Sequence, residues 1–243
     1  MRLDQEIVQR GLCESRKEAQ EMIKQGSVSV NGEVCLKQIR EVNESDDIKL
    51  SSRRKYVSRG GLKLEGVLCD VFGDEKEVRR FCEAKSALDV GSSTGGFTDC
   101  LLLHGVLTID AVDVGSAQAH TKIKNDNRVS VFENTDIRRF DGKKQYDIVV
   151  ADLSFISLED VLDVILSYGK SGGYYFLLLK PQFEVGPGNS KKGIVKNVAL
   201  VNQVSKRYVE LLEEKGLEEV RVFPSHVQGG DGNQEYFLVG IKK

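Results

Sequence analysis

The sequence predicts an α/β fold: a mostly parallel sheet covered by helices on both faces, preceded by a small α+β module. Two observations predict the sheet. Short apolar runs alternate with helical segments from about residue 87 onward, which is the pattern of repeated β-α units. A glycine-rich loop follows the first apolar run, as at the ligand-binding edge of such sheets. The first 50 residues instead predict two short helices and a hairpin, and the basic run Arg53-Arg54-Lys55 separates the two parts.

The composition is that of a folded protein without a membrane segment. The chain has 243 residues, of which 40% are hydrophobic and 30% charged, so it can bury a core. Its net charge is −2, so a nucleic-acid surface would have to be a local patch. The N-terminus has no signal-peptide pattern and no apolar run is long enough to cross a bilayer, so we expect a cytosolic protein with no membrane partner.

Cysteine and histidine give no sign of a metal site. The five cysteines form no Cys-x-x-Cys pair, and their odd number in apolar surroundings indicates reduced thiols. The three histidines are scattered, without the spacing of metal ligands. We therefore expect no metal.

The N-terminal module has clear helix and turn signals. A helix over residues 2–10 is followed by a capping box, in which Ser15 caps the second helix and Glu18 reaches back. This second helix is expected to end at Gly26. The alternating stretch that follows turns at Asn31-Gly32, which is a strong hairpin signal.

Glycine pairs and apolar runs predict the domain boundaries and the remaining helices and strands. Gly60-Gly61 is predicted to break the chain before a helix that starts at Leu62 and carries Lys63 in its first turn. The predicted domains are residues 1–52, a basic linker 53–62 and a catalytic domain 63–243. Strands are expected at 87–90, 107–112, 146–151, 174–179, 220–223 and 236–241, and helices at 98–103, 118–124, 158–168 and 200–215.

The loop after the first strand predicts a nucleoside-bearing ligand. Its glycines follow the pattern Gly91-x-x-x-Gly95-Gly96, with Ser93 where a dinucleotide-binding loop has its second glycine, and this argues against NAD. An ordinary strand-to-helix turn would account for one or two glycines but not for three within six positions. The loop resembles motif I of methyltransferases that use S-adenosylmethionine (SAM).

Charged residues stand at the ends of several predicted strands. A single charged residue after a buried strand is explained simply by the chain becoming exposed to water there. Asp152 and Lys180, however, end two separate apolar strands at the same edge of the sheet, which favours a functional role for the two together. Asp113, about 20 residues after the glycine loop, suits the ribose hydroxyls of a nucleoside. The predicted cofactor-binding residues are Gly91, Ser92, Ser93, Thr94, Gly95, Gly96, Phe97, Asp113, Asp136 and Asp152.

The N-terminal module resembles the S-four-type RNA-binding domain. The residues that carry the resemblance are Arg2-Leu3-Asp4, Gly11-Leu12, Ser15-Arg16-x-x-Ala19 and Gly26-x-Val28-x-Val30-Asn31-Gly32. Periodicity alone would leave the basic side chains of this module as solvated helix charges. The resemblance implies that they face RNA, and the predicted RNA-binding residues, including the linker, are Arg10, Arg16, Lys17, Lys24, Arg53, Arg54, Lys55 and Arg59.

The whole chain resembles the TlyA family of rRNA 2′-O-ribose methyltransferases, which often carry the label hemolysin A. The matching motifs are Tyr56 to Lys63, the loop at Gly91, Asp113, Ala151 to Ile156, Lys180 to Glu184 and Gly230-x-x-x-x-Glu235. The resemblance implies an FtsJ-like, Rossmann-like catalytic domain that uses SAM, and a catalytic tetrad of Lys63, Asp152, Lys180 and Glu235.

The resemblance also implies a substrate. The chain resembles the shorter type of the family, which modifies a cytidine of large-subunit rRNA, while the longer type also modifies small-subunit rRNA. The expected partner is ribosomal RNA or a ribosomal subunit. Lys180 would act as a base toward the 2′-hydroxyl or as a cation that stabilises the developing alkoxide, with the other three residues orienting it and the ribose.

Three other functions fit the sequence less well. A pore-forming cytolysin would require a membrane segment or a strongly amphipathic basic helix, which the sequence lacks. A non-catalytic RNA-binding protein is disfavoured by the intact glycine loop and the complete tetrad. A small-molecule methyltransferase would not need the N-terminal module.

Overall fold

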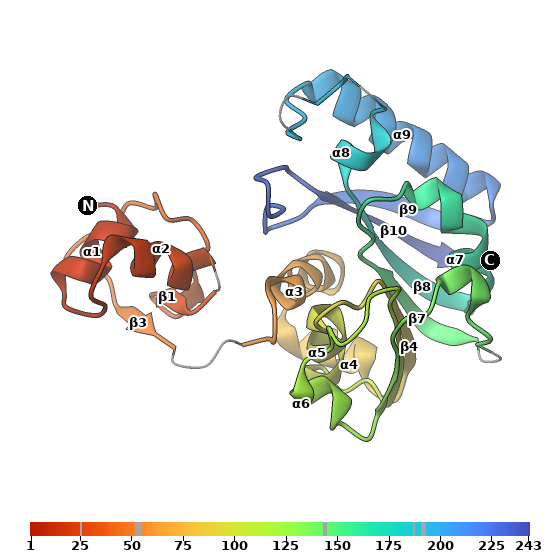
Figure 1. Ribbon diagram of the computed structural model, residues 1–243, viewed down its shortest axis with the longest axis horizontal. Coiled ribbons are helices and arrows are strands. Elements are labelled where there is room, and N and C mark those ends of the chain that lie inside the picture. The colour runs from red at the N-terminus through yellow and green to blue at the C-terminus, as the bar shows by residue number, and fades with distance from the viewer. Residues whose placement is uncertain (25, 52–54, 143–144, 187, 191–192) are drawn as a thin grey trace.

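The computed structural model describes the chain except residues 25, 52–54, 143–144, 187 and 191–192. Figure 1 shows a small N-terminal module and a larger domain built around a twisted sheet. Each part has a hydrophobic core of its own. Leu3, Ile7 and Ile23 are fully buried in the core of the small module, whereas the sheet carries one cluster of buried side chains on each face.

The N-terminal module packs two helices on a three-stranded antiparallel sheet of order β2-β1-β3. Its elements are α1 (Leu3–Gln9), α2 (Arg16–Lys24), β1 (Val28–Val30), β2 (Glu33–Val34) and β3 (Ile48–Leu50). The predicted hairpin turn is present, because Asn31 and Gly32 have φ values of 54° and 86°. Ser15 caps α2 as predicted, but the Glu18 carboxylate accepts from the backbone N–H of Glu14 rather than from Ser15.

The large sheet has seven strands in the order β6-β5-β4-β7-β8-β10-β9. The strands are β4 (Ser86–Val90), β5 (Thr108–Val112), β6 (Val129–Phe132), β7 (Tyr146–Ala151), β8 (Gly169–Leu179), β9 (Leu217–Pro224) and β10 (Tyr236–Lys242). The first five in spatial order are parallel, and β10 is antiparallel to both β8 and β9. The predicted α/β fold with a mostly parallel sheet is confirmed, and the last two strands are antiparallel neighbours.

Helices cover both faces of this sheet (Figure 1). On one face lie α3 (Arg59–Phe72), α4 (Glu75–Cys82) and α5 (Gly96–Leu103); the short α6 (Thr121–Lys124) adds Ile123 to the same core. On the other face lie α7 (Leu162–Ser167), which continues a 3-10 turn at Leu158–Val161, and the long α9 (Val198–Glu214). Strand β8 alternates its side chains between the two cores, because Phe176 and Leu178 belong to one and Leu177 to the other.

The Gly60-Gly61 pair does not break the chain as predicted: α3 begins at Arg59 and runs through both glycines. A Cβ atom on Gly61 would lie 2.2 Å from the ring of buried Tyr56, so this glycine lets the helix pass close to an aromatic side chain. Lys63 is therefore the fifth residue of α3 rather than part of its first turn.

Two helices are absent from the prediction. Helix α4 is capped by Asp74, whose carboxylate accepts from the backbone N–H groups of Lys76 and Glu77. Helix α8 (Pro181–Glu184) starts at the proline that was expected only to end a strand. Proline suits the first position of a helix, because the N–H it lacks would be unpaired there.

Candidate active site

The predicted tetrad gathers at the edge of the sheet where the parallel strands end. Asp152 follows β7 and Lys180 follows β8, and these two strands are hydrogen-bonded neighbours. Strand β10 runs the other way and pairs Tyr236 with Leu179, so Glu235 comes next to Lys180 at the same edge. Lys63 reaches this edge from α3.

The four tetrad residues form two ion pairs. The Lys180 ammonium lies 2.5 Å from an Asp152 carboxylate oxygen, and the Lys63 ammonium lies 2.5 Å from a Glu235 oxygen. Both lysines and Glu235 are buried, which is unusual for these residue types unless they are paired. Each buried positive charge is thus matched by a carboxylate.

Ser154 is a further partner of Lys180 that the sequence analysis did not assign. Its hydroxyl accepts a hydrogen bond of 2.7 Å from the Lys180 ammonium. The residue belongs to the motif that begins at Asp152, but nothing in a single sequence shows that its side chain turns toward the next strand. Lys180 is consequently held by two groups of one loop, Asp152 and Ser154.

Phe155 continues this loop and is 92% exposed, which is rare for an aromatic side chain. Its φ of +66° places it in the left-handed region, which is strained for a residue other than glycine. Its ring centroid lies 5.5 Å from that of Phe183 in α8. The loop therefore presents an aromatic face to solvent one residue away from Ser154.

The glycine loop packs closely against its neighbours. A Cβ atom on Gly91, whose φ is +78°, would lie 2.5 Å from the backbone oxygen of Asp152, so the loop and the tetrad edge are in contact. A Cβ on Gly95 would collide with Ile123, and one on Gly96 with Ser58. Gly95 is the N-cap residue of α5 and, having no side chain, provides no capping group itself.

Three other predicted cofactor-binding residues have side chains that already contact partners within the protein. The Asp113 carboxylate accepts from the backbone N–H groups of Ser93 and Gly115, at 2.7 and 2.6 Å, and so shapes the loop. Asp136 is hydrogen-bonded to Arg138, which holds the pKa of this carboxyl near 2. Phe97 lies in the core with its ring 5.9 Å from that of Phe237.

Asp89 belongs to the same loop region and was not assigned a role. Its side chain is fully buried, and one oxygen accepts from the backbone N–H and the hydroxyl of Thr98, at 3.0 and 2.6 Å. Its other oxygen has no partner among the described residues. Burial raises the pKa of this carboxyl to about 7, and the nearby negative charge of Asp152 acts in the same direction.

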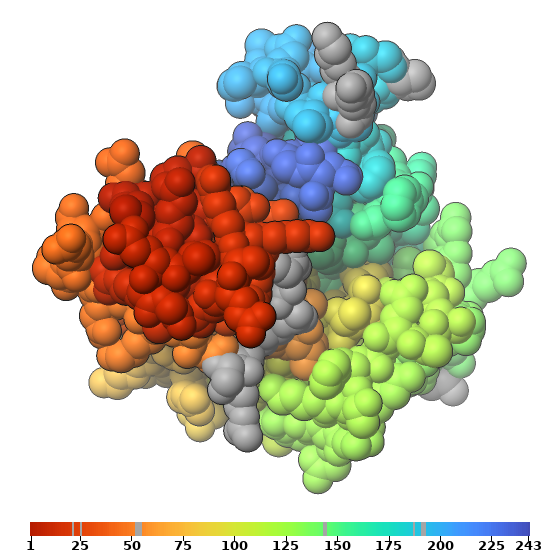
Figure 2. Space-filling model, turned by 60° about the vertical axis from the view of Figure 1, so that its left-hand side comes forward, coloured from red at the N-terminus to blue at the C-terminus, as the bar shows by residue number. Residues whose placement is uncertain are grey.

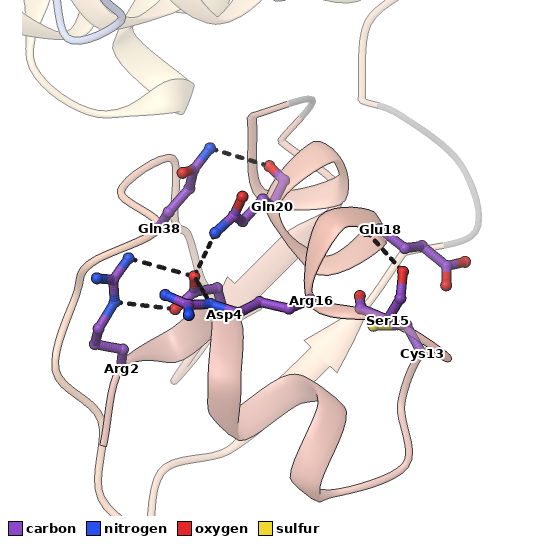
Figure 3. Close-up of polar contacts among 8 residues, drawn as sticks. All are labelled: Arg2, Asp4, Cys13, Ser15, Arg16, Glu18, Gln20 and Gln38. Carbon is purple, nitrogen blue, oxygen red and sulfur yellow. Dashed lines mark hydrogen bonds and ion pairs between the residues drawn. The ribbon is translucent and has the colours of Figure 1, made fainter.

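Two of the predicted RNA-binding arginines are held by partners inside the N-terminal module. Figure 3 shows the side chains of Arg2, Arg16 and Gln20 converging on the Asp4 carboxylate, which is fully buried. Although burial opposes the shift, these hydrogen bonds lower the pKa of Asp4. Arg10 pairs with Glu6 and donates to backbone oxygens of the loop 43–46. Arg16 and Arg10 thus support the fold of the module.

The linker residues are placed only in part. Arg53 and Arg54 lie outside the described residues. The Lys55 ammonium forms ion pairs with Glu65 and Glu75, which ties the predicted linker to α3 and α4. The Glu65 oxygen in this pair also lies 3.8 Å from the buried ring of His104. Lys55 thus has carboxylate partners within the protein.

Two of the remaining predicted RNA-binding residues, Lys24 and Arg59, line a cleft between the two parts of the chain. Figure 2 shows the N-terminal module beside the segment that precedes β10. The cleft has a volume of about 1310 Å³ and is lined by Lys24, Lys37 and Arg59, together with the loop 224–234. Lys17 is exposed on α2, outside the lining of this cleft. Because the loop 224–234 leads directly into Glu235, the cleft and the tetrad share this segment.

Comparison with known proteins assigns both parts of the chain. Residues 56–242 match the FtsJ-like methyltransferase family, and residues 1–48 match the S4 domain. The chain therefore belongs to the FtsJ-like methyltransferases and carries an S4 domain ahead of its catalytic part. Among the helices that the structure describes, none combines the length and the apolar character needed to cross a membrane.

Relatives define the family more narrowly. The chain is 38% identical to the 16S/23S rRNA (cytidine-2′-O)-methyltransferase TlyA of Mycobacterium tuberculosis, over 98% of this chain and 88% of the relative. It is 33% identical to the 23S rRNA (cytidine-2′-O)-methyltransferase TlyA of Campylobacter jejuni, over 97% and 98%. A solved structure described as a hemolysin of Streptococcus thermophilus superposes with a TM-score of 0.72 at 32% identity, covering 100% of this chain and 88% of that one. This chain is a member of the TlyA family, as its sequence motifs predict.

Proposed function

We propose that the protein methylates the 2′-hydroxyl of a cytidine ribose in ribosomal RNA, using SAM as the methyl donor. The observation that carries the proposal is the two ion pairs that hold the buried lysines, Lys180 with Asp152 and Lys63 with Glu235, at the sheet edge beside the glycine loop. Both named TlyA relatives act on 23S rRNA. Large-subunit rRNA is therefore the first substrate to test, and small-subunit rRNA the second.

The residues around the glycine loop fit the chemical groups of SAM. At the start of α5 the N–H of Thr98 donates to Asp89, and the N–H groups of Gly96 and Phe97 would be offered to a carboxylate. Asp113 closes the loop beside Ser93, and Asp136 and Asp152 add acidic groups on the same side. When bound, SAM supplies a methyl group that is already electrophilic because a sulfonium carries it. The proposed binding residues remain Gly91, Ser92, Ser93, Thr94, Gly95, Gly96, Phe97, Asp113, Asp136 and Asp152.

The chemical task left to the protein is to align a weak nucleophile and remove its proton. Lys180 is held by Asp152 and Ser154 at the end of a buried strand, which gives its nitrogen a fixed position. In that position the ammonium would stabilise the negative charge that develops on the ribose oxygen, whereas the neutral amine form of Lys180 would accept the hydroxyl proton. Lys63 and Glu235 would hold the ribose and complete the charge balance of the site.

The proposed division of labour gives RNA affinity to residues 1–52 and chemistry to the domain that follows the linker 53–62. The basic residues that face the interdomain cleft, Lys24, Lys37 and Arg59, support contacts to phosphate groups. The exposed ring of Phe155 beside the tetrad supports stacking on a nucleobase.

The test is transfer of labelled methyl groups from SAM to purified 50S subunits, 30S subunits and protein-free rRNA, followed by mass-spectrometric mapping. We expect 2′-O-methylcytidine, and none when the target nucleotide is replaced by its 2′-deoxy form. Lys180→Ala should lower kcat by about two orders of magnitude or more, with little change in SAM affinity.

The matched control is Lys170→Ala, because Lys170 lies at the opposite end of the same strand and pairs with Asp147. This variant should retain normal methylation. Near-normal methylation by folded Lys180→Ala, or methyl transfer to the deoxy substrate, would contradict the assignment.

A further inference from the structure

Glu184 is the last residue of the motif that begins at Lys180, and it takes part in neither ion pair of the tetrad. It is the last residue of α8, four positions after Lys180. Its carboxylate accepts three hydrogen bonds: from the backbone N–H of Leu158 at 2.9 Å, from the Ser157 hydroxyl at 2.7 Å and from the Tyr208 hydroxyl at 2.6 Å. Both carboxylate oxygens are in use.

Tyr208 connects this carboxylate to a third element. It comes from α9, is fully buried, and its hydroxyl also accepts from the backbone N–H of Glu159 at 3.2 Å. Burial and the neighbouring carboxylate of Glu184 raise the pKa of Tyr208, so the phenol stays protonated and donates to that carboxylate. The loop after β7, the helix after β8 and the long helix α9 therefore meet at Glu184.

The loop 152–158 is fixed at both ends by one short segment. Lys180 holds its first part through Asp152 and Ser154, and Glu184 holds its last part through Ser157 and Leu158. Between the two attachments stands Phe155 with its positive φ. A strained residue keeps such a conformation only where the surrounding contacts impose it.

We propose that Glu184 is a positioning residue of the active site, which keeps the loop 152–158 in the geometry that brings Asp152 and Ser154 against Lys180. The proposal rests on the proposed function for its effect on turnover, but its effect on the loop is independent of the reaction. A misplacement of about 1 Å at a reacting group can cost on the order of 100-fold in rate, so a tie this close to Lys180 matters for catalysis.

A carboxylate elsewhere in the same sheet provides the matched control. Asp147 accepts from the backbone N–H and hydroxyl of Ser86, at 2.9 and 2.7 Å, and from the Lys170 ammonium at 2.8 Å. Like Glu184, Asp147 thus connects three elements through three hydrogen bonds, here the strands β7, β4 and β8. These contacts lie at the end of the sheet opposite the tetrad. Asp147→Asn removes a comparable tie that does not contact the loop 152–158.

The experiment compares Glu184→Gln with Asp147→Asn in the full-length protein. The glutamine has one acceptor oxygen in place of two and turns an NH₂ group toward a donor, so at least one hydrogen bond is lost. We expect kcat to fall about 10- to 100-fold in Glu184→Gln, with KM for RNA and Kd for SAM changed less than about threefold. Asp147→Asn should keep kcat within about threefold. Tyr208→Phe removes one of the three hydrogen bonds to Glu184, together with the bond from the Glu159 N–H, and serves if Glu184→Gln does not fold; it should lower kcat less than Glu184→Gln does.

Amide hydrogen exchange gives a second readout that needs no substrate. The loop 152–158 should exchange faster in Glu184→Gln than in wild type and should be unchanged in Asp147→Asn. Should the wild-type protein fail to methylate RNA, the proposed function fails, while this exchange difference still decides whether Glu184 holds the loop.

A double-mutant cycle with Lys180→Ala separates positioning from general stability. If Glu184 acts through the Lys180 geometry, Glu184→Gln should cost little further rate once Lys180 is gone. The proposal is overturned by additive losses in the double variant, by equal losses of kcat in Glu184→Gln and Asp147→Asn, or by unchanged exchange of the loop in a folded Glu184→Gln.

Discussion

Asp89 and Thr98 show how one buried carboxylate fixes the turn that carries the glycine loop. Asp89 is the penultimate residue of β4, and its two hydrogen bonds from Thr98 join that strand to the first turn of α5. The charged form of this carboxylate is costly because the side chain is fully buried. Its pKa of about 7 means that a proton is bound more tightly in the folded protein than in the unfolded chain.

The consequence is a specific pH dependence of stability. Because the folded pKa is raised, the stabilising contribution of Asp89 is complete below its ordinary pKa of 3.8 and is lost as pH rises through about 7. Asp89→Asn keeps an acceptor for Thr98 and cannot ionise. We expect this variant to gain stability relative to wild type between pH 5 and pH 8, as measured by urea unfolding. A difference between the two proteins that stays constant over this range would show that Asp89 does not titrate there.

Substitution of Phe155 should affect RNA methylation without destabilising the fold. Its exposed ring contributes little to the core, and its positive φ is conformationally costly by roughly 1 kcal/mol. Phe155→Gly should therefore leave the free energy of unfolding unchanged or slightly raised. It should also weaken methylation of RNA about tenfold, because stacking on a base is worth about 1–3 kcal/mol.

The control for this prediction is Leu107→Ala. Leu107 is 59% exposed and lies just before β5, at the end of that strand away from the tetrad. Its loss should alter neither stability nor methylation. Unfolding in urea and initial methylation rates measure the two effects, and a large loss of stability in Phe155→Gly would refute the separation.

At the scale of elements, α3 depends on two adjacent glycines that have different neighbours. Gly61 faces the ring of Tyr56, where a Cβ atom would come within 2.2 Å, whereas a Cβ on Gly60 would meet its nearest neighbours, Phe97 and Ser58, at 3.4 Å. Tyr56 is 3% exposed and packs in the same core as α3, so it has no free space to move into. The helix thus tolerates a methyl group at one position and not at the next.

We predict opposite effects for the two alanine substitutions. Gly61→Ala should destabilise the protein by about 1–3 kcal/mol through overpacking. Gly60→Ala makes contacts at the tight end of the ordinary range and gains up to about 1 kcal/mol of helix propensity, so stability should change little or rise. Thermal unfolding of the two variants gives the comparison directly. Equal losses would mean that the Tyr56 contact does not limit α3.

The elements that the sequence predicts well are those with a local signal. Six of the seven strands of the large sheet overlap the expected segments, although β6 was not among them, and the Asn31-Gly32 turn needs only its own two residues. Helix α3 was misplaced because a glycine pair is a breaker by local rules, and its role here depends on Tyr56 packing from outside the helix. Helix α8 was missed because Pro181 fits both the end of a strand and the start of a helix.

Part of the candidate site could likewise be predicted from local signals in the sequence, and part could not. The sheet topology brings Asp152 and Lys180 to one edge, and that could be inferred from the two strand ends. The pairing of Lys63 with Glu235 could not be inferred, because these two residues are 172 positions apart. The hydrogen bonds of Ser154 and Glu184 likewise depend on how the loop 152–158 folds back on α8.

At the scale of the whole molecule, the chain has a net charge of −2 and yet presents basic groups to the interdomain cleft. Arg10 and Arg16 are held within the N-terminal module by Glu6 and Asp4. Lys24, Lys37 and Arg59, from both sides of the cleft, have no acidic partner among the described residues. The electrostatic attraction for an RNA backbone should therefore come from the cleft.

This distribution predicts how RNA binding responds to salt. Lys24→Ala combined with Lys37→Ala should weaken binding to rRNA and reduce the slope of log Kd against log salt by about one for each lost phosphate contact. SAM affinity should be unchanged, because these side chains belong to the N-terminal module. The matched control is Lys206→Ala on α9, whose side chain is 78% exposed and lies outside the cleft. Filter retention at several salt concentrations measures the Kd for rRNA of each variant. An equal change in slope for Lys206→Ala would mean that the cleft does not hold the RNA.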